Sequence, residues 1–132
     1  MLSNTLKHTN HTKEEIEEYL RKVKQSINVG KFVICTTVKN EKNRKFIERY
    51  NLNSNKQKEM LVELEVKDFC YSVDDYNRPH EKLYIFCREY ELNNWGIIEN
   101  VDVYIKIVIK QNDFIVIISF HKLEKNIKRL FV

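Results

Sequence analysis

The last third of the chain carries the pattern that most restricts the fold. Residues 101–111 and 114–120 are two runs of alternating side chains, separated by Asn112 and Asp113, which both tolerate the positive φ of a two-residue hairpin turn. The pattern predicts an antiparallel β-hairpin in which Gln111 lies opposite Phe114. Because successive side chains of a strand point to opposite faces, this register also decides which residues share a face.

One face of the predicted hairpin is entirely apolar, and we expect it to contact the core. It combines Val103 with the pairs Ile105–Phe120, Ile107–Ile118 and Ile109–Val116. The other face pairs Tyr104 with His121, Lys106 with Ser119, Val108 with Ile117, and Lys110 with Ile115. One end of this second face is therefore polar, and its partly apolar remainder needs a cover such as a helix. A three-residue loop would shift the register by one unless a β-bulge restored it.

The rest of the chain predicts helices first and strands afterwards. Thr12 and Glu15 form a capping box for a helix that Gly30 closes in the left-handed conformation. A strand over 32–36, helices over 41–50, 56–64 and 66–71, a turn region over 72–79, a strand over 82–90 and a loop over 93–100 follow. The expected fold class is α+β, with N-terminal helices packed on a small antiparallel sheet. We expect residues 1–11 to be a flexible N-terminus and residues 12–132 to form a single domain.

Basic residues are concentrated in two parts of the chain. Residues 31–58 carry eight lysine or arginine residues against two glutamates, and residues 121–132 carry four against one. The formal net charge of the whole chain is +4. A concentrated basic region is typical of a protein that binds a polyanion, although a lysine-rich face that only contacts solvent gives the same pattern.

Neither the apolar runs nor the cysteines indicate a membrane protein or a metal site. The longest apolar candidate, residues 114–120, has the length of a strand and not the ~20 residues that span a bilayer. Residues 1–11 lack the apolar centre of a signal peptide, so we expect a cytoplasmic protein with no membrane partner. Cys35, Cys70 and Cys87 are widely spaced and form no CxxC motif. We therefore expect reduced thiols, no metal and no cofactor.

The polar end of the hairpin has the components of metal-free acid–base chemistry on a phosphodiester. His121 can take or give a proton near neutral pH. Lys106 can bind a phosphate or stabilise the negative charge that develops on its oxygens. Tyr104 can orient the phosphate or an attacking 2′-hydroxyl, and Ser119 lies beside them. These four residues are candidates for a site, while the alternative is an ordinary solvent-facing hairpin with a surface histidine.

The same hairpin resembles the C-terminal hairpin of the MqsR-like toxins of type II toxin–antitoxin systems. The resemblance is most specific in Val103-Tyr104-Ile105-Lys106-Ile107 and Ile118-Ser119-Phe120-His121. Looser upstream matches are Gly30-Lys31-Phe32, the basic run 42–46, and the stretches 61–69, 74–79 and 83–86. Together these matches cover about residues 15–124, which is most of the chain.

The resemblance implies a RelE-like fold and an activity. These toxins are metal-independent endoribonucleases that cut mRNA and are held inactive by a cognate antitoxin protein. The tyrosine and lysine of the family's hairpin correspond to Tyr104 and Lys106. Where the family's best-known member has a lysine after the Ser-Phe pair, this chain has His121, which can also act as an acid or base. We therefore take Tyr104, Lys106 and His121 as candidate catalytic residues.

Candidate RNA-binding residues come from several parts of the chain. They are Ser119 in the hairpin, Arg78 and Lys82 before it, and Lys42, Arg44 and Lys45 in the basic helix. Tyr76 and Tyr84 could stack on bases, although packing is the expected role of Tyr84. The competing interpretation is a phage- or bacterium-encoded inhibitor that binds nucleic acid or protein without catalysis. In that case Tyr104 and His121 could be replaced without loss. A purely structural subunit should instead expose a large apolar patch.

Overall fold

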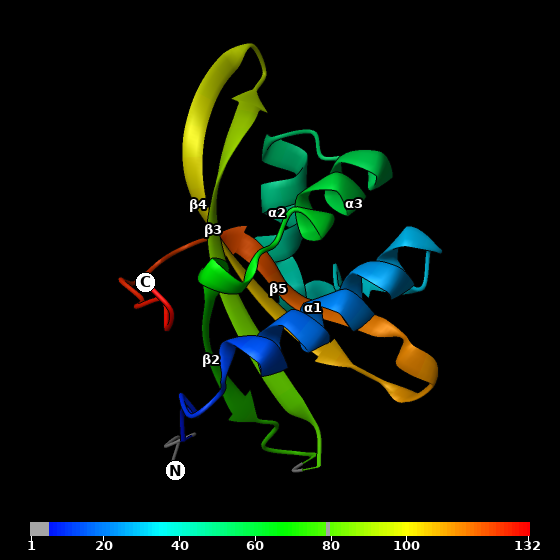
Figure 1. The fold of residues 1–132 in the computed structure, drawn as a ribbon. Coiled ribbons are helices and arrows are strands. Elements are labelled where there is room, and N and C mark those ends of the chain that lie inside the picture. The colour runs from blue at the N-terminus through cyan, green and yellow to red at the C-terminus, as the bar shows by residue number, and fades with distance from the viewer. Residues whose placement is uncertain (1–5, 79) are drawn as a thin grey trace.

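The computed structural model describes residues 6–78 and 80–132 (Figure 1). Residues 1–5, which belong to the predicted flexible N-terminus, and Pro79, which belongs to the predicted turn region, lie outside the described residues. The fold is α+β, with three α-helices and a five-stranded sheet. The helices are α1 (Lys13–Asn28), α2 (Glu41–Arg49) and α3 (Ser54–Val62), and the strands are β1 (Phe32–Ile34), β2 (Phe69–Asp74), β3 (Lys82–Asn94), β4 (Ile97–Ile109) and β5 (Ile115–Lys122).

The strand order is β1-β5-β4-β3-β2. The three pairings among β2 to β5 are antiparallel, as expected, but β1 pairs with β5 in parallel through Phe32 opposite Ile115. The predicted antiparallel sheet is therefore a mixed sheet. The parallel pair forms because α1 is followed by Gly30, whose positive φ of 81° turns the chain back along the edge of β5.

The core lies between the helices and one face of the sheet. Figure 1 shows the three helices on one side of the sheet and the C-terminal tail on the other. The capping box of Thr12 and Glu15 starts α1 as predicted. Apolar side chains of α1, such as Ile16 and Val23, are fully buried in the same cluster as Ile105 and Phe120.

The hairpin register agrees with the prediction at one end and differs at the other. Ile105 lies opposite Phe120, as predicted, but Ile107 lies opposite Ile117 because a bulge interrupts β5 between the two pairs. The cause is the turn, which is a three-residue loop, Gln111–Asp113, in which Asn112 and Asp113 have φ values of 60° and 59°. The bulge restores the register that this longer loop shifts.

The bulge also changes which residues of β5 face the core. Ile115 and Ile117 are fully buried, whereas Val116 and Ile118, which the two-residue turn would have placed inside, are only half-buried. The predicted pairs Val108–Ile117 and Lys110–Ile115 are accordingly wrong. They are replaced by the pairs Val108–Val116 and Ile109–Ile115.

Two other predicted elements are wrong. Residues 66–71 form only a 3₁₀ turn, Val66–Asp68, before β2 begins, because the following residues pair with β3. Residues 93–100 are a hairpin and not a loop. Trp95 and Gly96 have φ values of 51° and 103°, which make a tight turn, and the pairing of β3 with β4 continues up to Asn94 opposite Ile97.

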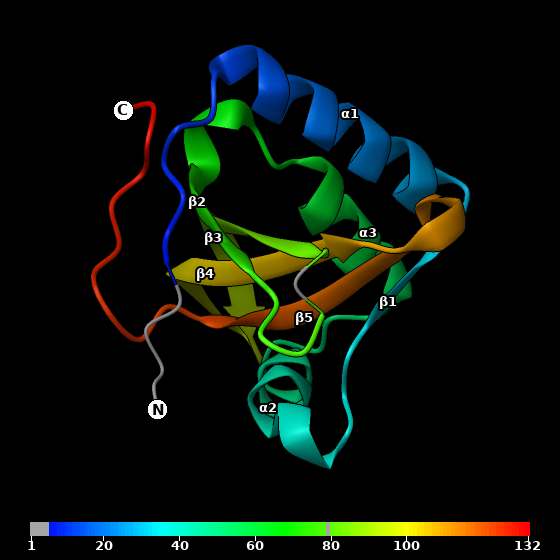
Figure 2. The ribbon, with the colours of Figure 1, turned by 90° about the horizontal axis from the view of Figure 1, so that it is seen from below.

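The second face of the sheet is covered by chain segments and not by a helix (Figure 2). Leu123 and Ile127 of the tail pack beside the buried Cys70, Ile85 and Cys87. On the N-terminal side, His8 exchanges two backbone hydrogen bonds with Ser72 and forms an isolated bridge to β2. No helix in the described part of the chain is long and apolar enough to cross a membrane.

Candidate active site

The polar end of the hairpin opens into a pocket on the second face of the sheet. Tyr104 and Lys106 on β4 lie directly opposite His121 and Ser119 on β5, as the sequence predicts. All four line a pocket of about 340 Å³. The remaining walls come from other parts of the chain, namely Lys7, Tyr71 on β2, and residues 123–127 of the tail.

The predicted catalytic side chains are in mutual reach. The rings of Tyr104 and His121 are stacked at 25°, with their centroids 5.5 Å apart. The ammonium of Lys106 lies 6.0 Å from the centroid of the Tyr104 ring. A phosphate seated in this pocket could therefore contact a phenol, an ammonium and an imidazole at once.

A hydrogen bond fixes the orientation of His121. Its Nδ1 lies 3.0 Å from the carbonyl oxygen of Lys122. A carbonyl oxygen can only accept, so Nδ1 carries the hydrogen and the neutral ring has its lone pair on Nε2. In this tautomer Nε2 is the atom that can remove a proton from a substrate.

Burial tunes the other two candidate catalytic groups. It raises the pKa of Tyr104, and the neighbouring Tyr71 raises it further, so the phenol keeps its proton at neutral pH. Burial also lowers the pKa of Lys106 from its ordinary 10.5, while Asp75 acts in the opposite direction. Tyr104 is thus a hydrogen-bond donor, and Lys106 is a stronger acid than an exposed lysine.

A second hollow of about 350 Å³ continues from the pocket toward α2. Both share His121, Leu123 and Glu124 as walls. The further residues of the second hollow include Lys42, Lys45, Arg49 and Lys122. Lys42 forms an ion pair with Glu124, with its Nζ 2.7 Å from the carboxylate, and so links α2 to the tail beside His121. The structure therefore brings two of the three predicted basic-helix residues to the edge of the site.

Three predicted RNA-binding residues do not line either hollow. Arg44 points its guanidinium toward Glu41 within α2. Arg78 is exposed in the loop between β2 and β3. Lys82 is on the opposite face of the sheet from Lys106, because it shares the face of Tyr84 and Phe86, which pack toward α1. Tyr84 is stacked on Tyr19 with ring centroids 3.8 Å apart, in agreement with its expected packing role, whereas Tyr76 is exposed.

The loop between β2 and β3 covers the apolar part of the second face. Glu81 at one end of the loop pairs with Lys110, with 2.7 Å between Nζ and the carboxylate. Asp75 at the other end is close enough to Lys106 to affect its pKa. Val108 lies between these two lysines on the same face and is 2% exposed. A loop therefore provides the cover that a helix was expected to give.

One buried residue on α2 holds the bulge that positions the site. The amide of Asn43 donates to the carbonyl oxygens of Cys35 and Ile118, both at 2.9 Å, and accepts from the backbone N–H of Phe120 at 2.8 Å. Ile118 is the residue that the bulge removes from regular pairing. Asn43 thereby fixes the part of β5 that carries Ser119 and His121. The sequence could have indicated it, because Asn43 is the polar member of the inward stripe with Phe46 and Tyr50.

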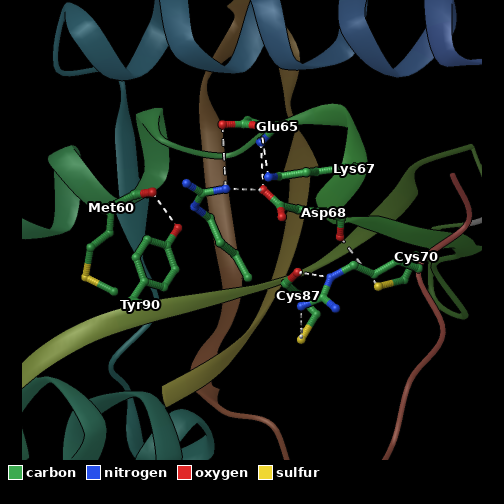
Figure 3. A network of polar contacts seen from close by, with 9 residues as sticks. Met60, Glu65, Lys67, Asp68, Cys70, Cys87 and Tyr90 are labelled. Atoms are coloured by element: carbon green, nitrogen blue, oxygen red, sulfur yellow. Dashed lines mark hydrogen bonds and ion pairs between the residues drawn. The ribbon is translucent and has the colours of Figure 1, made fainter. Parts of the chain in front are cut away.

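The tail is tied to the sheet next to the site. Arg129 donates from Nε to the carbonyl oxygen of Cys87 at 2.9 Å, as part of the network in Figure 3. In the same network Asp68 accepts from Arg88 at 3.0 Å and from the backbone N–H of Glu65 at 2.8 Å. Sequence reasoning missed the tail as a wall of the site, since nothing in a short polar segment indicates where it docks.

Comparison with known proteins does not assign the chain to a family. No model of a known protein family matches the chain, and no curated protein matches it. Within the described residues, no three His, Cys, Asp or Glu side chains are grouped so as to hold a metal ion. The interpretation of the site therefore depends on its own geometry.

Proposed function

We propose that the protein is a metal-independent endoribonuclease that cuts mRNA by attack of the RNA 2′-hydroxyl on the adjacent phosphorus. In this proposal it is the toxin of a type II toxin–antitoxin system, with a RelE-like fold and a cognate antitoxin. The observation that carries the proposal is the pocket in which Tyr104, Lys106 and His121 meet. The resemblance of the same residues to the MqsR-like hairpin supports it.

In this mechanism His121 carries out the first proton transfer. Its Nε2 accepts the proton of the 2′-hydroxyl, and the 2′-oxygen forms a bond to phosphorus. The bond from phosphorus to the 5′-oxygen then breaks, which leaves a 2′,3′-cyclic phosphate and a 5′-hydroxyl. DNA lacks the 2′-hydroxyl and is not a substrate.

Lys106 and Tyr104 both interact with the phosphate. The ammonium of Lys106 stabilises negative charge on the non-bridging oxygens, and its lowered pKa suits it to give the proton that the departing 5′-oxygen takes. The phenol of Tyr104 keeps its proton and donates a hydrogen bond to the phosphate. Arg78 does not line the pocket, so we assign no charge stabilisation to it.

The basic hollow beside α2 provides a path for the RNA backbone. Lys42, Lys45 and Arg49 line it, and it meets the pocket at His121. A chain of phosphates that follows this surface would place one phosphodiester over the catalytic residues, and binding should weaken as salt concentration rises.

The test is cleavage of a long single-stranded RNA by purified protein in EDTA, with the new ends mapped. We expect cyclic-phosphate ends from the parent protein. In Lys106→Ala and His121→Ala we expect rates at least about 100-fold lower, as for loss of a general acid or base. Tyr104→Phe should also lose activity, because it removes only the hydroxyl. His80→Ala is the matched control, since His80 is exposed in a loop and does not line the pocket.

Two results would overturn the proposal. One is RNA that stays intact both with the protein alone and in a translating extract. The other is cleavage that the three site variants retain in full. In either case the non-catalytic inhibitor becomes the better interpretation.

A further inference from the structure

The two longest strands form a ribbon that extends beyond the rest of the sheet. β2 pairs with β3 only as far as Phe86, and β5 pairs with β4 only up to Val103. Residues 89–94 and 97–102 pair with each other, the carbonyl oxygen of Asp102 at the base also accepts from the backbone N–H of Leu123 at 2.8 Å, and Figure 1 shows this ribbon projecting past the other strands. Its inner face contacts the helices through Tyr90, whose hydroxyl donates to Met60, and through Leu92, which is 2% exposed.

The outer face of the ribbon carries carboxylates without partners. Glu89 lies directly opposite Asp102, and Glu91 is two residues further along β3 on the same face. All three are exposed, and none forms an ion pair with any described residue. Like charges directly opposite each other on a sheet are destabilising, so this arrangement has a cost in the isolated protein.

The tip of the ribbon is apolar and exposed. The exposed fractions are 76% for Trp95, 66% for Ile97 and 58% for Ile98. A hollow of about 410 Å³ lies between the tip and the loop that joins α2 to α3, with Trp95 and Ile98 among its walls. Large apolar side chains gathered in this way mark interaction surfaces.

We propose that the outer face and free edge of this ribbon bind a polypeptide segment in extended conformation, with alternating basic and apolar side chains. An added strand would pair with the backbone of β3 residues 89–94, along the edge that β2 leaves free beyond Phe86. Its basic side chains would lie on the outer face near Glu89, Glu91 and Asp102. Its apolar side chains would reach the tip at Trp95 and Ile97.

The opposite charges of the two surfaces show that this partner and RNA would bind at different places. The ribbon from Arg88 to Asp102 contains four carboxylates and one arginine, whereas the walls of the hollow beside α2 include four lysine or arginine residues and one glutamate. A polyanion is repelled by the first surface and attracted by the second. The ribbon is therefore a protein-binding surface whether or not the pocket cleaves RNA.

Trp95 is the only tryptophan in the chain, so its fluorescence reports directly on the tip. The probe is a ten-residue peptide of alternating lysine and valine, titrated into the intact protein. We expect a saturable shift of the emission to shorter wavelength as Trp95 becomes buried. A peptide of alternating glutamate and valine and a uridine 12-mer should give no shift.

Charge-neutral variants test the role of the outer face. Glu89→Gln, Glu91→Gln and Asp102→Asn together should raise the Kd of the lysine–valine peptide by about tenfold, which is about 1.4 kcal/mol. This triple variant removes a like-charge pair, so weaker binding would not reflect loss of folding. The matched control changes three exposed glutamates elsewhere, Glu17, Glu48 and Glu63, to Gln and should leave the Kd within about twofold, because the net charge changes equally.

The proposal is overturned if the lysine–valine peptide gives no saturable shift of the Trp95 emission, or if both triple variants weaken the binding of this peptide equally. The proposal is also overturned if the uridine 12-mer shifts the Trp95 emission to shorter wavelength. A shift that depends on protein concentration without peptide, together with dimers in sedimentation, would mean that the ribbon binds a second copy of the chain instead. Tyr104→Phe should keep the peptide affinity, so this result does not depend on the ribonuclease assay.

Discussion

Replacing Asn43 with alanine tests whether one side chain holds the strand that carries the site. Asn43 is 2% exposed and makes three hydrogen bonds to backbone groups, one to Cys35 after β1 and two at the bulge, to Ile118 and Phe120. Alanine has a higher helix propensity than asparagine, so the substitution should not destabilise α2 itself. Any loss of stability should therefore come from the backbone groups that lose their hydrogen bonds to the amide.

The magnitude follows from counting those groups. A hydrogen bond contributes about 1 kcal/mol net, so three bonds correspond to about 3 kcal/mol. Asn40 also donates to Ile118 at 3.2 Å and should keep that carbonyl paired, which reduces the expected loss to between about 2 and about 3 kcal/mol. For a chain of this size the melting temperature should fall by about 10 °C.

The assay is urea unfolding followed by circular dichroism, with the m-value fitted separately for each protein. Asn55→Ala is the matched control, since Asn55 is exposed on α3, and it should change the free energy of unfolding by less than about 0.5 kcal/mol. Asn43→Asp should be at least as damaging as Asn43→Ala, because a carboxylate cannot donate to the carbonyls of Cys35 and Ile118. A loss below about 1 kcal/mol in Asn43→Ala would refute the reasoning that this amide holds the bulge.

Three smaller contacts give predictions of their own. Burial beside the rings of Phe69 and Tyr84 lowers the pKa of His11 below 6.5, so the unfolded chain takes up a proton first as the pH falls. The free energy of unfolding should therefore decline as the pH drops through 6.5, and urea unfolding of His11→Phe at about pH 7.5 and about pH 5.5 should show a smaller decline. Tyr90→Phe removes the bond to the Met60 carbonyl and should cost about 1 kcal/mol in the same assay. Burial raises the pKa of the Cys70 thiol to about 12, so this thiol should react slowly with Ellman's reagent until deletion of residues 123–132 removes Leu123 and Ile127, which pack beside it.

The sequence predicted best where a local pattern and the tertiary contacts agree. The capping box, the helix that ends before Gly30 and the pairing of Tyr104 with His121 all depend on residues that are close in sequence or joined by one turn. The two wrong elements depend on distant partners. Residues 69–74 become a strand only because β3 pairs with them, and the ribbon continues past residue 93 only because Trp95 accepts a left-handed conformation that is unusual for its type.

The candidate site was predictable in part for a physical reason. The two departures from the two-residue turn, a loop one residue longer and a bulge at Ile118, cancel before the strands reach Lys106, which is the alternative that the sequence left open. The pairing at the polar end is therefore the same as in the simpler hairpin, while the pairing near the turn is not. The bulge that cancels the shift is held by the side-chain amide of Asn43 on α2, and no pattern within the hairpin contains that information. The catalytic candidates could be found from the two strands alone, whereas Tyr71, Lys7 and the tail could be added only once the second face was seen to be covered.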